Sequence, residues 1–501
     1  MASAVMTTTG VIAPVRSRLS TALIVASLCL CGTVVSLQQT LVVPILPELP
    51  RLLSTSSDNA SWLVTATLLA GAVSTPVVSR LADMFGKRKM IVLCLLFSIG
   101  GSFIGAFSTS LLTVVAGRTL QGVGMALIPV GIAIMRDELP KERVPLGVAL
   151  MSATLAVGAG AGLPLAGIIA SSTDWHAIFW VTAGAGILML VFVLLVLPES
   201  PVRSPGHFDY RGAAGLTIAL TALLLAISKG GVWGWGNPWT LGLGFGGLLV
   251  LIAWVPLELR VRRPLVDIRV ARRPAVLLVN ISSVLVGFAM FGNMLVTTQL
   301  LQLPTSTGYG LGLGMVESGL WLAPTALVFG ALAPVSAAIT RRFGAHTTLM
   351  SGALIMSVFY VARVFLSNDL TQIVIGAMLV SVGTSLTYAA MPTLIMRAVP
   401  VTETASANGL NTLLRSVGTS MSSAAVGVAL SVGTVLIAGE SHPALSSFQL
   451  IFWGSALTCL VSAVLALPLR RLTADSEYDE DERAIDDAVP TTDVAARGGI
   501  G

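Results

Sequence analysis

The chain has 501 residues, of which 54% are hydrophobic and 11% are charged, and its mean hydropathy is +0.88. Soluble domains carry about 25% charged residues, so this composition excludes a water-soluble globular protein. The formal net charge is +5. Basic residues gather on one side of membrane proteins, so this excess does not indicate a nucleic-acid partner.

Long apolar runs divide the chain into spanning helices. A hydrocarbon core about 30 Å thick requires roughly 20 apolar residues for each helix that crosses it. The runs predict an all-α membrane protein with fourteen helices at 21–43, 60–80, 90–109, 112–135, 146–170, 177–197, 212–229, 239–257, 275–299, 316–339, 347–366, 371–395, 408–436 and 449–469. The first run is too long for a cleaved signal peptide, so we expect it to remain as a spanning helix.

The basic residues predict how these helices are oriented. Of the 29 Lys and Arg residues, 24 fall on one side of the membrane when both termini are placed on that side. Only Arg51 and Lys229 fall on the other side, while Arg118, Arg363 and Arg415 lie within apolar runs. We therefore expect a multi-pass protein of a bacterial plasma membrane with both termini in the cytoplasm.

Two turns repeat one pattern at the same spacing, which predicts two related halves. Pro76 and Gly86 flank the first turn, and Pro334 and Gly344 flank the second. The plan is six, two and six helices. Its segments are a cytoplasmic N-tail (1–20), a six-helix half (21–197), two inserted helices (198–258), a basic cytoplasmic joint (259–274), a second six-helix half (275–470) and an acidic, disordered C-tail (471–501).

A charged turn between the second and third runs carries the most specific pattern in the chain. The segment 79–89 reads SRLADMFGKRK. Asp83 stands at the cytoplasmic end of the second helix, where a carboxylate can pair with Arg or cap the N-terminus of a neighbouring helix. The same charges could instead only anchor the loop in the cytoplasm.

This turn resembles the loop between the second and third helices of major facilitator transporters. The resemblance implies two pseudo-symmetric six-helix halves that move against each other. It also implies a conformational latch, closed in one state and open in the other, formed by Asp83, Gly86, Arg80, Lys87 and Arg88.

The fourth run contains an element at 117–124 that resembles the R-x-x-Q-G-x-G pattern of the same family, with Arg118 and Gln121 as its polar members. An Arg inside a membrane run costs about 2.5–3.5 kcal/mol on insertion scales, so we expect it to face a cavity or a partner. The resemblance implies proton coupling or solute contact. The alternative is an Arg that snorkels from the outer end of the helix.

The fifth run contains Gly158, Gly162, Pro164 and Gly167 and resembles the exporter signature of the family. Glycines at this density permit close helix packing, and a proline bends a helix. The resemblance implies an exporter, whereas a general packing face of small residues is the alternative.

Further local matches indicate the fourteen-helix drug–proton antiporter branch of the major facilitator superfamily. They are Trp62 and the segments 174–180, 208–212, 233–235, 263–267 and 408–418. This resemblance covers about residues 20–470 and implies multidrug efflux and drug resistance.

The first helix lacks the acid that this branch usually carries, because Gln38 stands at that position. All 24 acids map to loops, helix ends or the tail, and Glu317 is the one that could tip inward from a helix start. The candidates for coupling or for the cavity are Arg118, Gln121, Gln38, Gln39, Arg415, Asn411, Asn293, Tyr388 and Glu317. A cationic solute beside a buried Arg is unfavourable, so we expect neutral, amphipathic or anionic solutes. Polar packing between helices is the alternative role of the two glutamines.

These patterns predict a secondary exporter of drugs or amphipathic small molecules that works as a monomer by alternating access, coupled to proton influx. We expect no enzymatic activity, no cofactor and no metal site, and the chain contains no G-x-x-x-x-G-K-[ST] pattern for ATP. The open alternatives are a non-drug exporter, an importer of a metabolite, lipid or siderophore, and a membrane scaffold without transport.

Overall fold

The computed structural model describes residues 18–472, apart from 43–44, 46–48, 173, 201, 205, 368 and 438–439. In this part of the chain fourteen helices are long and apolar enough to cross a membrane, which confirms the all-α membrane fold expected from the apolar runs. The acidic tail from residue 473 lies outside the described residues, as do residues 1–17.

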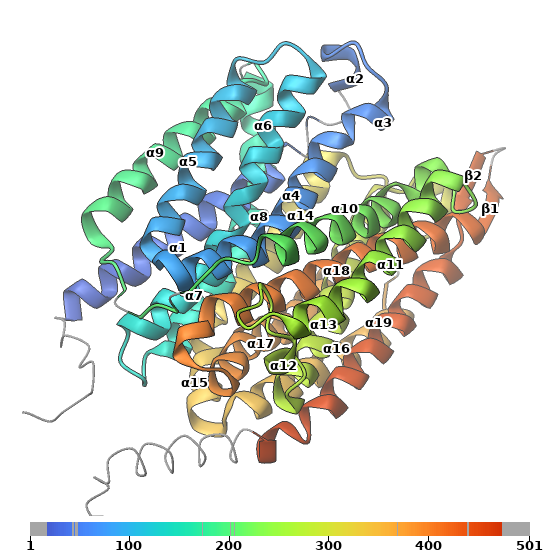
Figure 1. The fold of residues 1–501 in the computed structure, drawn as a ribbon. Helices are drawn as coiled ribbons and strands as arrows, with labels where there is room; N and C mark the ends of the chain where they lie inside the picture. Colours follow the sequence, from blue (N-terminus) through green and yellow to red (C-terminus); the bar gives the residue numbers. More distant parts are fainter. Residues whose placement is uncertain are drawn as a thin grey trace, which may run out of the picture.

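Six spans form the first half of the chain. They are α1 (Arg18–Thr40), α4 (Trp62–Phe85), α5 (Lys87–Ala106), α6 (Leu111–Val123) continued through η2 (Gly124–Ala126) into α7 (Leu127–Glu138), α8 (Val144–Ser172) and α9 (Ala177–Val196). Two short helices, α2 (Leu49–Leu52) and α3 (Ser57–Ala60), connect α1 to α4. Figure 1 shows them at the end of the bundle opposite α7.

The last six spans form the second half. They are α13 (Pro274–Gln302), α14 (Met315–Ala331) with α15 (Ala333–Phe343), α16 (Ala345–Phe365), α17 (Leu370–Ala398), α18 (Thr404–Val432) and α19 (Leu445–Ala466). The connections carry α12 (Ile268–Ala271), η3 (Thr305–Thr307), η4 (Val401–Glu403) and an antiparallel hairpin of β1 (Thr434–Ile437) and β2 (Glu440–Pro443). Thr434 pairs with Pro443 in this hairpin, which the apolar pattern did not predict.

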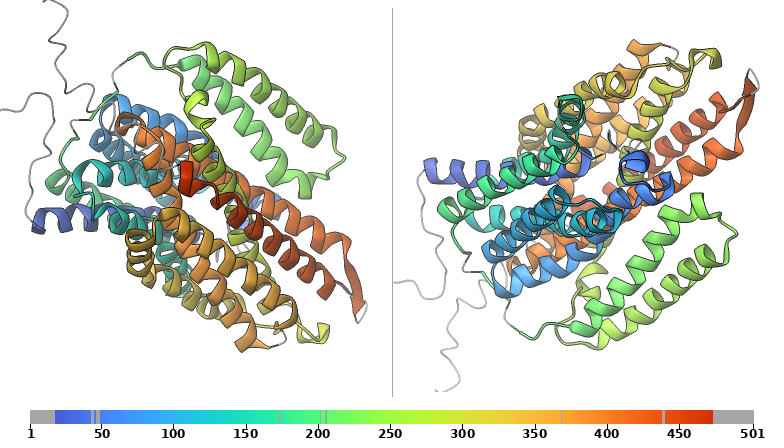
Figure 2. Two further views of the ribbon diagram at one scale, coloured as in Figure 1. Left: turned by 90° about the horizontal axis from the view of Figure 1, so that it is seen from below. Right: turned by 90° about the horizontal axis from the view of Figure 1, so that it is seen from above.

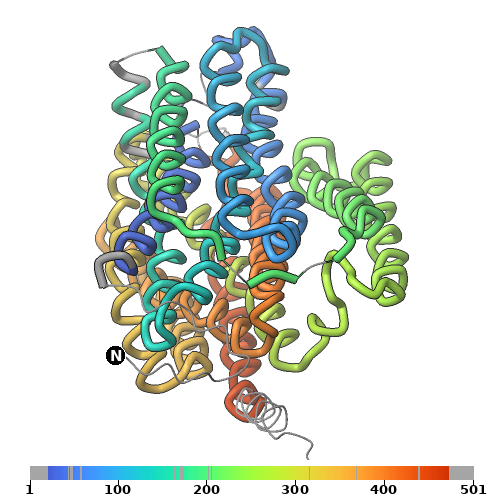
Figure 3. The backbone as a smooth tube through the Cα atoms, turned by 60° about the vertical axis from the view of Figure 1, so that its left-hand side comes forward, coloured from blue at the N-terminus to red at the C-terminus, as the bar shows by residue number. Residues whose placement is uncertain are grey.

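The inserted helices, α10 (Tyr210–Trp233) and α11 (Pro238–Arg260), pack on each other at one edge of the bundle (Figures 2 and 3). α10 also packs on α4 and α18, so the pair covers a place where the two halves meet. One buried apolar cluster joins all of these elements, and its members are Ala72, Leu216, Leu220, Leu224, Trp254, Leu265, Val266 and Leu413.

The two halves pack on each other along two helix crossings. On one side α8 packs against α14, α15 and α17, and on the other α4 packs against α18. The α8 crossing is close, since a Cβ on Gly160 would lie 2.2 Å from Cβ of Ala326. Ser152 adds a hydrogen bond to the Tyr388 carbonyl at 3.1 Å. Small residues therefore set the distance between the halves, as expected for helices in a membrane.

The charged turn is shorter than the apolar runs predicted. α4 continues to Phe85 and α5 begins at Lys87, so Gly86 alone makes the turn, with φ of 120°. The charged residues on either side therefore lie on helix ends. We call the end of the molecule that holds this turn and η4 the latch side.

Lys229 differs from its expected place at the very end of the helix predicted for 212–229. It lies within α10 and is 1% exposed. Its Nζ donates to Ser61 Oγ at 2.7 Å and lies 4.8 Å from the ring centroid of Trp62. This contact fastens the C-terminal end of α10 to the start of α4.

A pair of carboxyl groups fastens the inserted helices on the latch side. Asp209 Oδ1 accepts the Gly212 N–H at 2.8 Å, and Glu258 Oε1 accepts the Val266 N–H at 2.8 Å. The other oxygen of each carboxyl group is buried, and each lies 2.5 Å from the place of a Cβ on Gly212. Two carboxylate oxygens that face the same point without a hydrogen-bond partner repel each other, so we expect a neutral donor at either position to stabilise this contact.

Substitutions of Glu258 test this contact. Glu258→Gln keeps the acceptor for Val266 and adds an N–H toward Asp209, so the thermal midpoint in detergent should stay the same or rise. Glu258→Ala removes both functions and should destabilise by about 1–3 kcal/mol, because it leaves buried polar groups unpaired. Equal destabilisation by both variants would contradict repulsion between the two carboxyl groups.

Candidate functional site

Asp83 joins the two halves at the latch side. α4 brings its carboxylate to the first turn of α18, where Oδ1 accepts the Ala405 N–H at 3.1 Å and Oδ2 accepts the Ser406 N–H at 2.7 Å. The first N–H groups of a helix have no partner within the helix, and its N-terminus carries partial positive charge. The buried carboxylate, which comes from the opposite half, therefore accepts hydrogen bonds from the free N–H groups of α18 and also balances the positive charge of its N-terminus.

Lys87 and the backbone of Arg88 bind acids other than Asp83, while the Arg88 guanidinium donates to the Leu194 carbonyl. Lys87 Nζ lies 2.5 Å from Asp137 Oδ2 at the end of α7, and Ser200 Oγ donates to the same oxygen at 2.6 Å. The Arg88 N–H donates to Glu199 Oε1 at 3.2 Å. Of the two roles open to Asp83, helix capping is therefore the one in this structure. Its neighbours hold the end of α7 and the segment after α9 in place.

Gly86 is required by both conformation and space. Its φ of 120° lies in the region that residues with a Cβ rarely adopt. A Cβ there would also lie 2.6 Å from Oε1 of Glu199, the oxygen that accepts the Arg88 N–H. A side chain at position 86 would therefore strain the turn and displace Glu199 from the Arg88 N–H.

Arg136 makes a second contact between the halves, which the sequence analysis did not single out. From α7, its Nη1 donates to Thr404 Oγ1 at 2.8 Å, and both terminal nitrogens lie 3.2 Å from the Val399 carbonyl. The sequence feature that could have indicated this contact is the position of Arg136 at the end of the fourth span. Asp83 and Arg136 therefore both hold one segment, which runs from the end of α17 to the start of α18.

Arg118 lies in the first half and is 1% exposed. Its Nη1 donates to the Gln38 carbonyl at 2.6 Å and to Gln121 Oε1 at 2.8 Å, and its Nε donates to the Leu63 carbonyl at 3.2 Å. No ion pair with a carboxylate is recorded for it among the described residues. Arg118 thus connects α1, α4 and α6 through neutral acceptors and does not snorkel to the surface.

The glutamines extend this network. Gln121 Nε2 donates to Ser102 Oγ at 2.8 Å, and Ser98 Oγ donates to Gln38 Oε1 at 2.6 Å. The Nε2 atoms of Gln38 and Gln39 are buried and have no hydrogen-bond partner among the described residues. The sequence predictions for Arg118, Gln121 and Gln38 thus fall in one polar cluster, and Gln39 lies beside it in sequence without a recorded bond to it.

The second half buries a matching arginine on α16. Arg363 donates from Nη1 to Asn293 Oδ1 and from Nη2 to Thr297 Oγ1 at 3.0 Å, and its Cζ lies 4.4 Å from the ring centroid of Phe452. Asn293 is the predicted cavity residue that the structure brings to this group. In the sequence, Arg363 stands out only as a basic residue within an apolar run.

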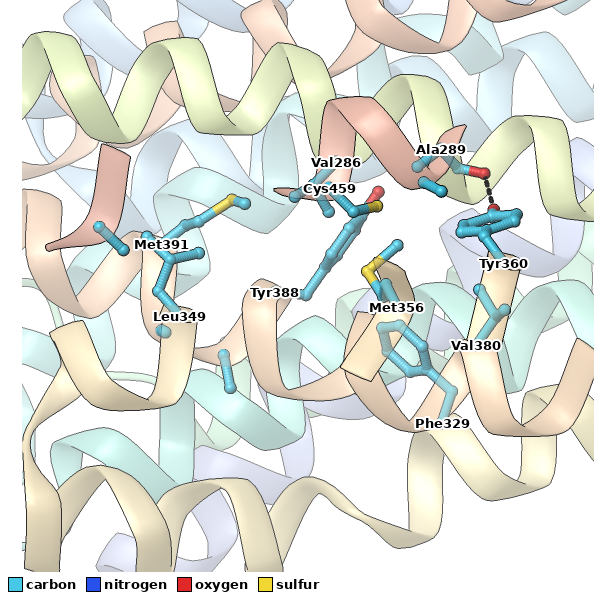
Figure 4. Packing of buried hydrophobic residues seen from close by; sticks show 14 of the residues in the cluster. Val286, Ala289, Phe329, Leu349, Met356, Tyr360, Val380, Tyr388, Met391 and Cys459 are labelled. Carbon is cyan, nitrogen blue, oxygen red and sulfur yellow. Dashed lines mark hydrogen bonds between the residues drawn. The ribbon is translucent and has the colours of Figure 1, made fainter. Parts of the chain in front are cut away.

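Arg415 and Asn411 lie on α18, one turn apart. The Arg415 Cζ is 4.5 Å from the ring centroid of Tyr388, and Asn411 Nδ2 donates to Ser283 Oγ at 2.6 Å and to Asn280 Oδ1 at 3.0 Å. Figure 4 shows Tyr388 among the apolar side chains of the second half, with Phe329 nearby. These contacts are within the second half, so Arg415 and Arg118 belong to separate clusters.

Two of the predicted sites, Glu317 and the glycine motif of α8, do not join these polar clusters. Glu317 is exposed at the start of α14 and does not point inward. In α8, a Cβ on Gly158 would lie 2.4 Å from Cβ of Ser36, and one on Gly162 would meet Thr40, so both glycines face α1. Pro164 and Gly167 belong to α8 but lie outside the residues whose side-chain surroundings the structure describes.

Comparison with known proteins identifies the family of this arrangement. The sequence model of the Major Facilitator Superfamily matches residues 28–423. The chain is 25% identical to the multidrug resistance protein Stp of Mycobacterium tuberculosis over 77% of this chain and 71% of that protein. It is 27% identical to the tetracenomycin C resistance and export protein of Streptomyces glaucescens, over 79% and 73% of the two chains.

Two further similarities agree with these matches. The lincomycin resistance protein LmrB of Listeria monocytogenes is 23% identical over 83% of this chain and 87% of its own length. Among solved structures, the human organic anion transporter MFSD10 superposes with a TM-score of 0.64, at 16% identity, over 89% of this chain and 99% of that chain. The structural match establishes the fold.

Substitution of Gly86 tests the turn. Gly86→Ala should destabilise by about 1–3 kcal/mol, because it places a Cβ in a strained backbone conformation. Gly184→Ala is the matched control, since that glycine lies within α9 with nothing within 4 Å of its Cβ position. The control should be neutral or stabilising by about 0.5–1 kcal/mol, as for glycine inside a helix. Thermal unfolding in detergent measures both, and an equal response would contradict the role of Gly86.

Proposed function

The chain belongs to the Major Facilitator Superfamily, and from this premise we propose that it exports amphipathic small molecules, drugs among them, by alternating access driven by proton influx. Members of the family carry small solutes across membranes, and this chain is not an enzyme. We place it in a bacterial plasma membrane as a monomer with both termini in the cytoplasm, so that the latch side faces the cytoplasm.

The bond between Asp83 and the first turn of α18 carries the proposal. It joins the halves through a charge-assisted contact that can break as a unit, because the N–H groups it covers can return to water. Arg136 adds a contact of the same kind to Thr404 and Val399. We assign this arrangement to the state whose cytoplasmic side is closed, and we expect rocking of the halves to open it.

The proposed solute class rests on the charges inside the spans. In the described spans every Asp and Glu lies within a few residues of a span end, whereas Arg118 and Arg415 lie deeper. These two arginines are buried, as is Arg363 in the last turn of α16. A buried cation beside these groups would gain no carboxylate partner and would lose its hydration. We therefore expect neutral, amphipathic or anionic solutes to be preferred over multivalent cations.

The exporting direction and the proton rest on other features. The names of Stp, LmrB and the tetracenomycin protein concern resistance or export, and the glycine pattern of α8 resembles the exporter signature of the family. Coupling requires a titratable group whose surroundings change with the state. Asp83 is such a group, because opening the latch side would move it from the N-terminus of α18 into water.

Transport in inverted membrane vesicles tests the function. With an imposed pH gradient, acid inside, addition of a neutral or anionic amphipathic solute should release protons and concentrate the solute inside. Vesicles without the protein provide the control. Solute uptake that is unaffected by collapse of the pH gradient would contradict proton coupling, and no uptake of any compound from a chemically mixed panel would contradict export.

The solute preference has its own test. Efflux of aromatic dications should be weak, whereas efflux of neutral or anionic solutes should depend on Arg415. Dication efflux that is lost in Arg415→Ala but retained in Glu317→Gln would contradict the preference.

The latch is tested by Asp83→Asn, with spin labels at positions 141 and 341, which are exposed on the latch side of the two halves. Loss of the charged hydrogen bonds, worth about 1.5–3 kcal/mol each, should raise the fraction of molecules with a long distance between the labels. Asp369→Asn is the matched control, because Asp369 caps the N-terminus of its own helix, α17. An unchanged distance distribution in Asp83→Asn would contradict the latch.

A further inference from the structure

A polar cavity of about 360 Å³ lies beside the latch, where the halves meet the segments before α10 and after α11. Its size falls in the range of about 300–1,000 Å³ typical of small-molecule sites. The charged residues in its wall are Arg80, Arg203, Arg262, Arg263, Asp267 and Glu403. They come from α4, from both segments that flank the inserted helices, and from η4, so the cavity exists only when all of these parts are assembled.

The charges in the wall do not balance. Four guanidinium groups face two carboxylates, and one of the carboxylates is already engaged. Asp267 Oδ1 accepts the N–H groups of Arg269 at 2.9 Å and Val270 at 3.4 Å, which caps α12. Glu403 is left as the acid available to the arginines, and it interacts electrostatically with Arg80. The cavity therefore offers more positive charge than its own residues neutralise.

Arg80 distinguishes this cavity from an ordinary basic surface. Arg341 and Arg342, at the end of α15, are exposed on the same side and need no partner beyond water. Arg80 is 6% exposed, yet the described residues provide no hydrogen bond to its guanidinium. Its guanidinium nitrogens are not among the buried side-chain atoms that lack a partner, so they open onto the cavity, where an acceptor on a ligand can reach them.

Neighbouring contacts hold the other arginines near the cavity. A Cβ on Gly206 would lie 2.2 Å from Nη1 of Arg263, so this guanidinium packs against the backbone of the segment before α10. Glu258 fixes the segment after α11 through the Val266 N–H. Planar guanidinium groups suit phosphate oxygens because they donate two parallel hydrogen bonds.

We propose that this cavity binds a phosphate-bearing anion, either the headgroup of an anionic phospholipid or a soluble phosphate monoester. Arg80 lies one turn before Asp83 on α4, and Glu403 directly precedes α18, so the ligand contacts both sides of the latch. A ligand that binds one state stabilises that state by mass action. The anion therefore favours the state with the latch closed, a consequence that rests on the proposed alternating access, whereas the binding site itself does not.

The binding test uses the full-length protein in detergent and records its thermal midpoint. The additions are phosphatidylglycerol, phosphatidylcholine, glycerol 3-phosphate and inorganic phosphate, with chloride at matched ionic strength. We expect phosphatidylglycerol or glycerol 3-phosphate to raise the midpoint, while phosphatidylcholine and chloride do not. A response to phosphatidylglycerol alone identifies the lipid as the source, and a response to glycerol 3-phosphate at least as large identifies a soluble ligand.

Variants connect the response to the cavity. Arg262→Gln combined with Arg263→Gln should weaken the apparent affinity about tenfold or more, because two charged hydrogen-bond donors are lost. Arg341→Gln combined with Arg342→Gln is the matched control and should respond as the wild type does. If the first double variant does not fold, Arg203→Gln, which alters one exposed linker residue, should weaken binding in the same direction.

Four results would overturn the proposal. They are an equal response to chloride, an equal response to phosphatidylcholine, a wild-type response in the cavity variants, and a response that appears only after deletion of 473–501. The last would make the acidic tail the occupant. The readout is independent of solute transport, so a thermal response without transport would contradict the proposed function and leave the site standing.

Discussion

The structure depends on one contact, the carboxylate of Asp83 on the first turn of α18. The first N–H groups of a helix that begins at a membrane boundary need an acceptor, and here the opposite half supplies it with a full negative charge. The Asp83 carboxylate stays in place because the end of α4 is fixed. It is fixed by the turn at Gly86, by the ion pair of Lys87 with Asp137, and by the hydrogen bond from the Arg88 backbone N–H to Glu199. The halves are thus joined by charged hydrogen bonds that are strong while water is excluded. When water enters, it can replace both the carboxylate and the N–H groups as a partner.

The spans are organised around buried arginines that have no carboxylate beside them. Arg118 and Arg363 each donate to neutral oxygens, and Arg363 and Arg415 also lie over aromatic rings. Such partners lower the cost of a buried charge without neutralising it. These buried positive charges support the proposed preference against cationic solutes and agree with Gln38 at the place of the expected acid.

The inserted helices do more than lengthen the chain. They lie over the crossing of α4 and α18, and the segments that connect them bring three arginines to the latch side. Lys229 and the pair of Asp209 with Glu258 fasten the two ends of the insert. An anion bound among those arginines would connect the inserted helices with α4 and η4. The proposed ligand would therefore let the inserted helices stabilise the closed latch.

The sequence by itself determined the fourteen spans and the charged turn, because hydropathy and turn chemistry act over a few neighbouring residues. It also fixed the absence of an acid at position 38. Tertiary structure alone decided that Asp83 caps α18, since its partners are backbone N–H groups more than 300 residues away, which leave no mark in a sequence. It likewise decided that Lys229 is buried and Glu317 exposed, because burial at a helix end depends on which helix packs there.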